Sequence, residues 1–365
     1  MAIDYNARLQ KLLDTTGHDV VALMPGPNML YFTGLHYHLS ERPIIAFVSK
    51  EGLSFIVPQL EVTKLTSRTD IEAQAFDWSD SHGYEGAFKQ AIEQLGLGKG
   101  ASWAADGMTM RVFEWLALEK AGADMGHSSD VGQDLLMLRA YKTPEEIELM
   151  REAIKISEEA LQRTIDWVTV GKTEREIAKK LESEMSALGG EGLAFGSLVL
   201  TGEKTALPHG TTAGRQLQEN EFLLFDFGAS KSDYPADITR TFCIGTPSDD
   251  MRKVYDTVLA ANQAAHAISK PGVTCHEVDK AARDVIEAAG YGEFFTHRLG
   301  HGLGLSGHEL PNIAPNNHTK LEIGMVFTIE PGIYQPGVGG VRIEDDVVVT
   351  ENGIESLTTF PRDLQ

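Results

Sequence analysis

Cysteine is nearly absent from this sequence, which has only Cys243 and Cys275 among its 365 residues. Two cysteines cannot form a disulfide framework, and neither lies in a C-x-x-C motif, so we expect two buried residues in a reducing, cytoplasmic setting. The opening segment, MAIDYNARLQKLL, lacks the basic and apolar regions of a signal peptide. Apolar runs of about 18 residues are also missing, so no membrane-spanning helix and no membrane partner are expected.

Positive charge is the second scarce feature. The chain has 32 lysines and arginines against 53 aspartates and glutamates, which gives a formal net charge of −21. This balance disfavours nucleic acid as a partner, because its phosphates would be repelled. It also suggests that some of the acids hold cations instead of facing solvent.

The length allows two domains, and the pattern of elements changes near residue 140. Before that point, short apolar runs alternate with helical patterns, which predicts a small α/β domain over residues 1–139. The predicted strands lie at 20–25, 43–49 and 53–58, and the predicted helices at 4–16, 84–95 and 109–121. The second domain, 140–365, begins with a helix whose capping box is Thr143 to Glu146.

The second domain contains a faint internal repeat. GKTEREIAKKLESEMSALGG (171–190) resembles GVTCHEVDKAARDVIEAAGY (272–291), and each copy begins with a capping box, from Thr173 and Thr274. A helical stretch precedes each copy, at 144–168 and 248–269. A histidine segment and two acid-bearing strands follow each. Chance similarity between amphipathic helices is the alternative, and the matching order of the acids weakens it.

Four acids lie in segments that predict burial. Asp226 is in FLLFDFG, Asp237 in ADITRTF, Glu330 in VFTIEPG and Glu344 in GVRIEDD. A buried carboxylate is costly unless it is paired or bound to metal, and a single one is usually an ion pair or a hydrogen-bonded core residue. Two nearby arginines cannot neutralise four acids, so the repeated arrangement favours cations.

Two divalent cations would balance these four carboxylates, and a neutral histidine would add a ligand without charge. Such an oxygen-rich site favours Mn²⁺, with Co²⁺, Fe²⁺ and Zn²⁺ as alternatives. A pair of metals activates water near neutral pH, which suits hydrolysis. Arg342 lies two residues before Glu344, which predicts one strand face and a supporting role for this arginine; a surface arginine is the alternative.

Three histidines and four glycines occur in HRLGHGLGLSGHE (297–309). The glycines argue against a helix with histidines on one face, since each costs about 1 kcal/mol in a helix interior. The stretch contains G-x-G-x-x-G, but Pro311 and Pro315 follow where a dinucleotide site requires a helix. The remaining interpretation is a metal or catalytic site that the backbone approaches closely.

Together, the motifs resemble a known family. LLFDFG, DITRTF, HRLGHGLGLSGHE, TIEPGIY and VRIEDD, in this order, resemble the metallopeptidases of the pita-bread fold, in the branch of prolidase (Xaa-Pro dipeptidase) and aminopeptidase P. The resemblance covers roughly 143–360, and NMLYFTGL and EGLSFIVPQLE resemble the family's N-terminal domain less specifically. It implies an α/β (α+β) fold, with a small creatinase-like N-terminal domain and a C-terminal pita-bread domain containing a pseudo-twofold repeat.

The resemblance also implies a ligand set for two metal ions. Its members are Asp226, Asp237, His301, Glu330 and Glu344. In this family the counterparts of Asp237 and Glu344 bridge the metals, those of His301 and Glu330 bind one metal, and that of Asp226 binds the other. None of the five positions is substituted, whereas non-catalytic relatives have lost ligands.

Further roles follow from the resemblance. Glu330 is expected to act as general base and then acid, and His308 to donate to the oxyanion. His297 and His209 would hold the substrate and its proline ring, and Tyr334 and Arg342 match supporting positions. A homodimer is expected from the family alone.

The segment GLHYHLSERP contributes two weaker candidates, His38 and Arg42. In relatives the N-terminal domain can cover an active site, sometimes that of the neighbouring subunit. These side chains are therefore candidates for binding the far end of the substrate, and a solvated loop is the alternative.

The expected activity is dinuclear-metal-dependent hydrolysis of the Xaa-Pro bond in dipeptides or short peptides. A dipeptidase needs a cation for the proline carboxylate, and the loop before TIEPG, where larger prolidases have an arginine, contains only His318 and Lys320. Arg42 or His38 is the candidate for that role. We expect a dipeptidase, because the chain is short and compact, with an aminopeptidase P as the alternative. A lyase of the same fold and a non-enzymatic binding module are the remaining alternatives.

Overall fold

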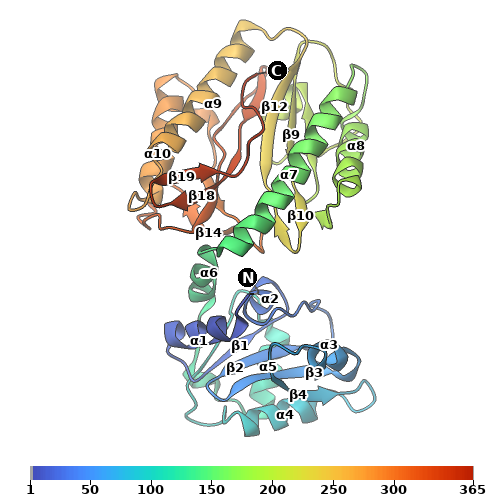
Figure 1. Cartoon of the computed structure of the whole chain (residues 1–365), viewed down its shortest axis with the longest axis vertical. Helices are drawn as coiled ribbons and strands as arrows, with labels where there is room; N and C mark the ends of the chain where they lie inside the picture. The colour runs from blue at the N-terminus through green and yellow to red at the C-terminus, as the bar shows by residue number, and fades with distance from the viewer. Residues whose placement is uncertain (1–2, 365) are drawn as a thin grey trace. The chain divides into compact units, whose positions relative to one another are not determined.

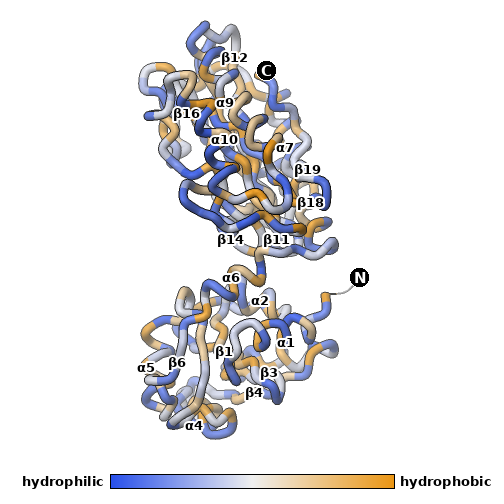
Figure 2. Tube along the Cα trace, turned by 90° about the vertical axis from the view of Figure 1, so that its left-hand side faces the viewer, coloured by the Kyte–Doolittle hydropathy of each residue, from blue (hydrophilic) through white to orange (hydrophobic). Residues whose placement is uncertain are grey.

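The computed structural model describes residues 3–364, which divide between two compact units, Met1–Arg139 (unit 1) and Ala140–Gln365 (unit 2). Each unit has its own cluster of buried hydrophobic residues, and Figure 2 shows hydrophobic segments in both. Among residues 3–364, no helix is long and apolar enough to cross a membrane.

Unit 1 is built on one sheet, whose strands are β1 (Val20–Leu23), β2 (Ile45–Ser49), β3 (Gly52–Pro58), β4 (Ala73–Trp78), β5 (Trp103–Ala105) and β6 (Ser128–Asp130). The strand order is β4-β3-β2-β1-β5-β6. The pairs β1–β2 and β2–β3 are antiparallel, whereas β3–β4, β1–β5 and β5–β6 are parallel. The helical segments are α1 (Tyr5–Thr16), α2 (Pro27–Thr33), η1 (Gln59–Glu61), α3 (Val62–Thr66), α4 (Glu85–Gln94), α5 (Val112–Ala121), η2 (Met125–His127) and α6 (Gly132–Ala140).

The strands and helices predicted for unit 1 are confirmed, with boundaries shifted by at most three residues. The helix predicted from residue 109 begins at Val112. Asp106 closes a separate turn before it: its backbone oxygen accepts from the amides of Thr109 and Met110, and its carboxylate from the Thr109 hydroxyl. This turn satisfies the groups that an earlier helix start would have used.

Unit 2 contains two helix pairs, one in each predicted half. They are α7 (Pro144–Trp167) with α8 (Glu174–Ala187), and α9 (Asp249–Ile268) with α10 (Cys275–Ala288). The capping boxes predicted at Thr143, Thr173 and Thr274 are all present. Figure 1 shows α9 and α10 on one side of the strands and α7 and α8 on the other, which is the arrangement expected of a repeated half.

The strands of unit 2 are β7 (Gly192–Leu193), β8 (Leu198–Thr201), β9 (Glu221–Phe227), β10 (Ala229–Lys231), β11 (Tyr234–Pro235), β12 (Ile238–Ile244), β13 (Gly300–Gly302), β14 (Glu309–Ile313), β15 (Val326–Ile329), β16 (Gly332–Gln335), β17 (Gly339–Arg342), β18 (Asp345–Thr350) and β19 (Gly353–Ser356). Two 3-10 helices accompany them, η3 (Gly202–Ala206) and η4 (Gly292–Phe294). The sheets run β12-β9-β8 in the first half and β14-β13-β15-β18-β19 in the second, with the smaller sheets β11-β10-β7 and β16-β17.

The two halves are joined where β12 meets the end of β17 and Glu344, which follows β17 by two residues. The Glu344 amide donates to the Thr239 carbonyl at 3.1 Å, and the Thr241 hydroxyl donates to the Arg342 carbonyl at 3.0 Å. Acid-bearing segments that lie more than 100 residues apart in sequence therefore come together at this junction.

Alternation along β9 explains why an acid is tolerated in an apolar strand. Phe225 and Phe227 belong to the core that includes Leu161 of α7 and Leu181 of α8. Because successive side chains point to opposite faces, Asp226 points away from that core. The strand thus buries its phenylalanines and presents its carboxylate to the other half of the unit.

The prediction that all four acids lie within strands is wrong for three of them. Asp226 is inside β9, but Asp237 precedes β12, Glu330 follows β15, and Glu344 lies between β17 and β18. Each of these three acids lies outside the hydrogen-bonded strand pairs for a local reason. The Asp237 amide donates to the Asp346 carboxylate, Pro331 follows Glu330 and lacks an amide hydrogen, and Glu344 lies where the chain changes sheets.

One smaller expectation is also corrected, because Arg342 ends β17 and so does not share a continuous strand with Glu344. The link between the first two acids forms β10 and β11 around Ser232 and Asp233, which both have positive φ. The two predicted buried cysteines are confirmed as buried and unpaired.

Candidate metal centre and active site

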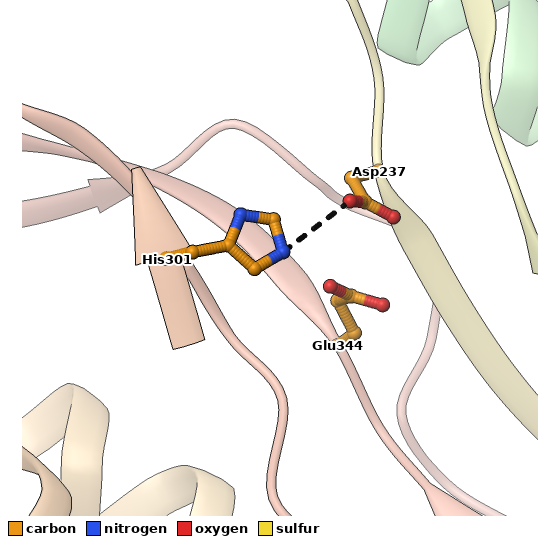
Figure 3. A group of neighbouring side chains, drawn as sticks. All are labelled: Asp237, His301 and Glu344. Carbon is orange, nitrogen blue, oxygen red and sulfur yellow. Dashed lines mark ion pairs between the residues drawn. The ribbon is translucent and has the colours of Figure 1, made fainter. Parts of the chain in front are cut away.

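Three of the predicted metal ligands converge in unit 2. Asp237, His301 and Glu344 each offer a ligand atom, and these atoms all lie within 4.8 Å of one another. Figure 3 shows the three side chains pointing toward a common point, with Asp237 coming from the first half and the other two from the second. His301 Nε2 lies 3.7 Å from Asp237 Oδ2.

The other two predicted ligands lie beside this group. Glu330 Oε1 is 3.3 Å from His301 Nε2, and Asp226 is held by Arg342, whose Nη2 lies 2.5 Å from Asp226 Oδ2. All five side chains line one cavity of about 600 Å³. The structure therefore brings the whole predicted set together.

Hydrogen bonds orient His301 for metal binding. Its Nδ1–H donates to the Gly302 carbonyl at 3.1 Å, so the lone pair of Nε2 faces Asp237 and Glu330. Burial lowers the pKa of His301 to about 3. The ring is therefore neutral at physiological pH, which is the form that binds metal.

The carboxylates are buried close together and raise one another's pKa values. Burial, followed by the charges of Glu344 and Asp226, raises the pKa of Asp237 well above its usual value. Glu344 is shifted the same way by burial and by Glu330, and burial raises the pKa of Glu330 to about 7. Raised pKa values mean that these carboxyl groups keep protons because too little positive charge lies nearby. Divalent cations would supply that charge, and the donors are mostly hard oxygen atoms, which such cations prefer.

Arg342 connects the acids to the histidines. It donates to the Thr239 hydroxyl at 2.9 Å and to the Tyr334 hydroxyl at 3.0 Å, besides its ion pair with Asp226. Thr239 in turn donates to Glu344 Oε2 at 2.5 Å. The alternative of a surface arginine is excluded, because Arg342 is 5 % exposed.

His297 lies at the end of this network. Its Nδ1–H donates to the Arg298 carbonyl at 2.7 Å, and the Tyr334 hydroxyl donates to its Nε2 at 2.8 Å. Burial lowers the pKa of His297 to about 4, so its ring is neutral near pH 7. Tyr334, which also accepts from Arg342, thereby fixes the orientation of this ring.

His209 and His308 line the same cavity from loops and are more exposed. The centroids of the His308 and His301 rings are 4.1 Å apart. All three predicted catalytic histidines therefore border the cavity that holds the acids.

The glycines of 297–309 are explained by neighbouring backbone. A Cβ atom at Gly300 would lie 1.9 Å from the Thr328 carbonyl oxygen, and one at Gly302 would lie 2.1 Å from that of Leu310. These glycines let the strand that carries His301 pass tightly between β14 and β15. Only Gly307 has open space around it and lines the cavity.

Several residues of the site were missed from sequence. Arg298 lines the cavity, and its Nη1 donates to Asn312 Oδ1 at 2.6 Å. Arg298 directly follows His297 in the sequence, and a cationic residue next to a candidate catalytic histidine could have indicated a place in the site. Thr239 follows Asp237 by two residues, and that spacing was the signal for a shared face.

Asp345 and Asp346, which follow Glu344, were also missed, and both contact residues next to the cavity. Asp345 is buried, and although burial opposes ionisation, Arg240 lowers its pKa below the ordinary value. Arg240 is therefore committed to Asp345, at 2.8 Å, and does not neutralise the ligand acids. Asp346 Oδ2 accepts from the Asp237 amide at 3.0 Å and so holds that ligand's backbone.

His38 and Arg42 lie in unit 1. The guanidinium of Arg42 forms a two-pronged pair with Asp80, at 2.8 and 3.1 Å, and His38 is exposed beside His36. Their role in binding substrate stays a prediction.

Comparison with known proteins places these features in a family. Residues 148–351 match the metallopeptidase family M24, and residues 6–140 match the creatinase/prolidase N-terminal domain. This chain belongs to metallopeptidase family M24. It has the α/β fold of that family, with a creatinase-type N-terminal domain followed by the pita-bread domain.

Full-length relatives support the assignment. A Xaa-Pro dipeptidase of Pyrococcus furiosus is 37 % identical over 98 % of each chain. The structure of a prolidase from Thermococcus sibiricus is similar with a TM-score of 0.93 and 33 % identity, covering 100 % of this chain and 99 % of the other. An X-Pro aminopeptidase from Thermotoga maritima is similar with a TM-score of 0.85 and 34 % identity, over 98 % and 99 % of the two chains.

We predict that Gly300→Ala destabilises the protein and weakens metal binding. The added methyl group would push β13 away from Thr328, and overpacking of this kind costs about 1–3 kcal/mol. Urea unfolding and metal titration of the apoprotein would measure both effects. Gly307→Ala is the matched control, and equal stability of the two variants would contradict the packing argument.

We also predict a pH signature of His297. Its folded pKa of about 4 lies below the ordinary 6.5, so its contribution to stability is fully present above pH 6.5 and is lost as pH falls toward 4. The slope is at most about 1.4 kcal/mol per pH unit for one group. The unfolding free energy of the metal-free protein should therefore fall more steeply between pH 7 and 5 than that of His297→Gln; parallel curves would refute this.

Proposed function

We propose that this metallopeptidase hydrolyses the Xaa-Pro bond of dipeptides and depends on two divalent metal ions. The observation that carries the proposal is the convergence of four carboxylates and one neutral imidazole, with three further histidines, around a single cavity. Relatives named Xaa-Pro dipeptidase, at 33–37 % identity over the full length, support the same activity.

The metal ligands we propose are Asp226, Asp237, His301, Glu330 and Glu344. The oxygen-rich donor set favours Mn²⁺, with Co²⁺, Zn²⁺ and Fe²⁺ as alternatives. When bound, the ions would polarise the scissile carbonyl and make water a stronger nucleophile near neutral pH. They would also replace the protons that the buried acids otherwise retain.

The other groups act on the substrate and its protons. Glu330 would accept a proton from the attacking water and return it to the leaving nitrogen. His308 would donate to the developing oxyanion. His297 and His209 would hold the proline end, with His297 positioned by Tyr334 and, through it, by Arg342.

Arg298 supplies the cation that a dipeptidase needs for the proline carboxylate. It lines the cavity, and in the described part of the chain its guanidinium contacts an amide oxygen, that of Asn312, and forms no ion pair. Its charge is therefore available to a ligand. This favours a dipeptidase over an aminopeptidase P, whose substrates continue beyond the proline.

Three broader features belong to the same proposal. Residues 1–139 would be the non-catalytic N-terminal domain and 140–365 the catalytic domain. The two unpaired, buried cysteines suit a cytoplasmic protein. A homodimer is expected from the family.

The first test is hydrolysis of Ala-Pro and Ala-Pro-Ala by protein that has been chelated and then reloaded with Mn²⁺. We expect metal-dependent cleavage of the dipeptide, with the tripeptide a poor substrate. Preferred cleavage of the tripeptide would establish the aminopeptidase alternative. Two bound metals without cleavage of either peptide would overturn the Xaa-Pro assignment.

A second prediction concerns Arg298. Arg298→Met should raise KM for Ala-Pro about 10-fold or more, because a hydrogen-bonded charge is worth roughly 1.5–3 kcal/mol. The substrate Ala-Pro-amide, which lacks the carboxylate, should show little change and serves as the control. An equal loss on both substrates would show that Arg298 does not bind the carboxylate.

A further inference from the structure

A buried ion pair lies near the active site but outside the ligand set. Lys142 Nζ is 2.9 Å from Glu309 Oε2, and the two side chains are 2 % and 1 % exposed. Glu309 follows directly after His308, whereas Lys142 comes from the start of unit 2, 167 residues earlier in the chain. The pair therefore connects the segment just before α7, at the start of unit 2, to the histidine segment 297–309.

The Glu309 carboxylate closes the loop that presents His308. This loop, 303–308, joins β13 to β14, and Glu309 is the first residue of β14. Glu309 Oε1 accepts from the Ser306 amide at 3.0 Å. Its other oxygen lies so near the backbone that a Cβ atom at Gly304 would be 2.5 Å away from it. The loop is thus wrapped around this carboxylate.

Lys142 is held as firmly as its partner. Its amide donates to the Gly324 carbonyl at 2.8 Å, and its neighbour Tyr141 forms a β-bridge with Met325. Residue 142 also directly precedes Thr143, the N-cap of α7. The backbone at residues 141 and 142 is therefore anchored to residues 324 and 325, outside the loop that carries His308.

We propose that Lys142 and Glu309 are positioning residues that set the place of His308 relative to the metal ligands. The inference rests on the proposed function, in which His308 donates to the oxyanion. Lys142 stabilises the ionised form of Glu309, and that carboxylate holds the Ser306 amide and thereby the loop. Neither residue touches substrate, so their effect on the reaction passes through His308.

A simple structural role is distinguishable from this one. A buried ion pair can often be replaced by apolar residues without loss of stability, whereas removal of one partner is strongly destabilising. Apolar replacement of both residues would restore the packing of the fold. It would not restore an acceptor for the Ser306 amide, so the loop would still be released.

The decisive experiment is a double-mutant cycle between Lys142→Met and His308→Ala, assayed on Ala-Pro with metal content measured for each variant. We expect Lys142→Met to lower kcat about 10- to 100-fold with KM and metal content nearly unchanged, since a misplaced group costs this much. In the His308→Ala background the same substitution should lower kcat by less than about 3-fold, because the side chain through which Lys142 acts is already missing. Equal losses in both backgrounds would overturn the proposal.

Two further variants keep the test informative if Lys142→Met folds poorly. Lys142→Met with Glu309→Leu should recover thermal stability while kcat stays low; recovery of both would indicate a purely structural pair. The single variant Glu309→Gln keeps an acceptor for the Ser306 amide, so it should retain a higher kcat than the single variant Glu309→Leu. The reverse order would contradict the argument that this carboxylate holds the loop.

Arg215→Met is the matched control, because Arg215 pairs with Glu221 at the end of β9 distant from Asp226. It should lower stability and show no coupling to His308. If the unmodified protein cleaves no Xaa-Pro substrate, the proposed function is wrong. If the protein is active but Lys142→Met shows no coupling to His308→Ala, only the proposed positioning role of Lys142 and Glu309 is wrong.

Discussion

The structure depends on the mutual repulsion of carboxylates that are buried within a few ångströms of one another. Asp237, Glu330 and Glu344 all have raised pKa values, because each lies in a low-dielectric environment beside other acids. Such a cluster is unfavourable in isolation, so the surrounding fold must hold it in place until cations neutralise it. The helices and sheets of unit 2 form the frame that opposes this repulsion.

The frame works because two similar halves each contribute part of the cluster. The first half brings Asp226 and Asp237 on β9 and ahead of β12, and the second brings His301, Glu330 and Glu344. Thr239 and Arg342 join the halves by bonding to one another and to an acid on the opposite side. The same bonds lead through Tyr334 to His297, so the proposed metal ligands and the histidine proposed to bind substrate share one network.

Glycine and charge serve distinct purposes in the histidine segment. Gly300 and Gly302 allow neighbouring strands to approach closely on either side of His301, and Gly304 makes room for the Glu309 carboxylate. His301 is thus fixed by strand packing, whereas His308 lies on a loop whose closure relies on the pair of Glu309 with Lys142. The difference agrees with the proposed roles, in which His301 binds metal and His308 contacts the substrate.

By itself, the sequence determined the elements and the composition of the site. Capping boxes and periodicity are local, so the four helices of unit 2 could be placed from Thr143, Thr173, Thr274 and the apolar spacing. The acids could be chosen because four carboxylates in apolar segments recur in the same order in both halves, and the nearby arginines are too few to neutralise them. What only the tertiary structure decided is which charges meet. Arg240 and Arg342 look equivalent in sequence, yet one pairs with Asp345 behind the site and the other with Asp226 inside it. The pairing of Lys142 with Glu309 was equally hidden, since the two residues lie 167 positions apart in the sequence. Such pairings depend on how strands from distant parts of the chain pack together, and side-chain charge acts through space rather than along the sequence.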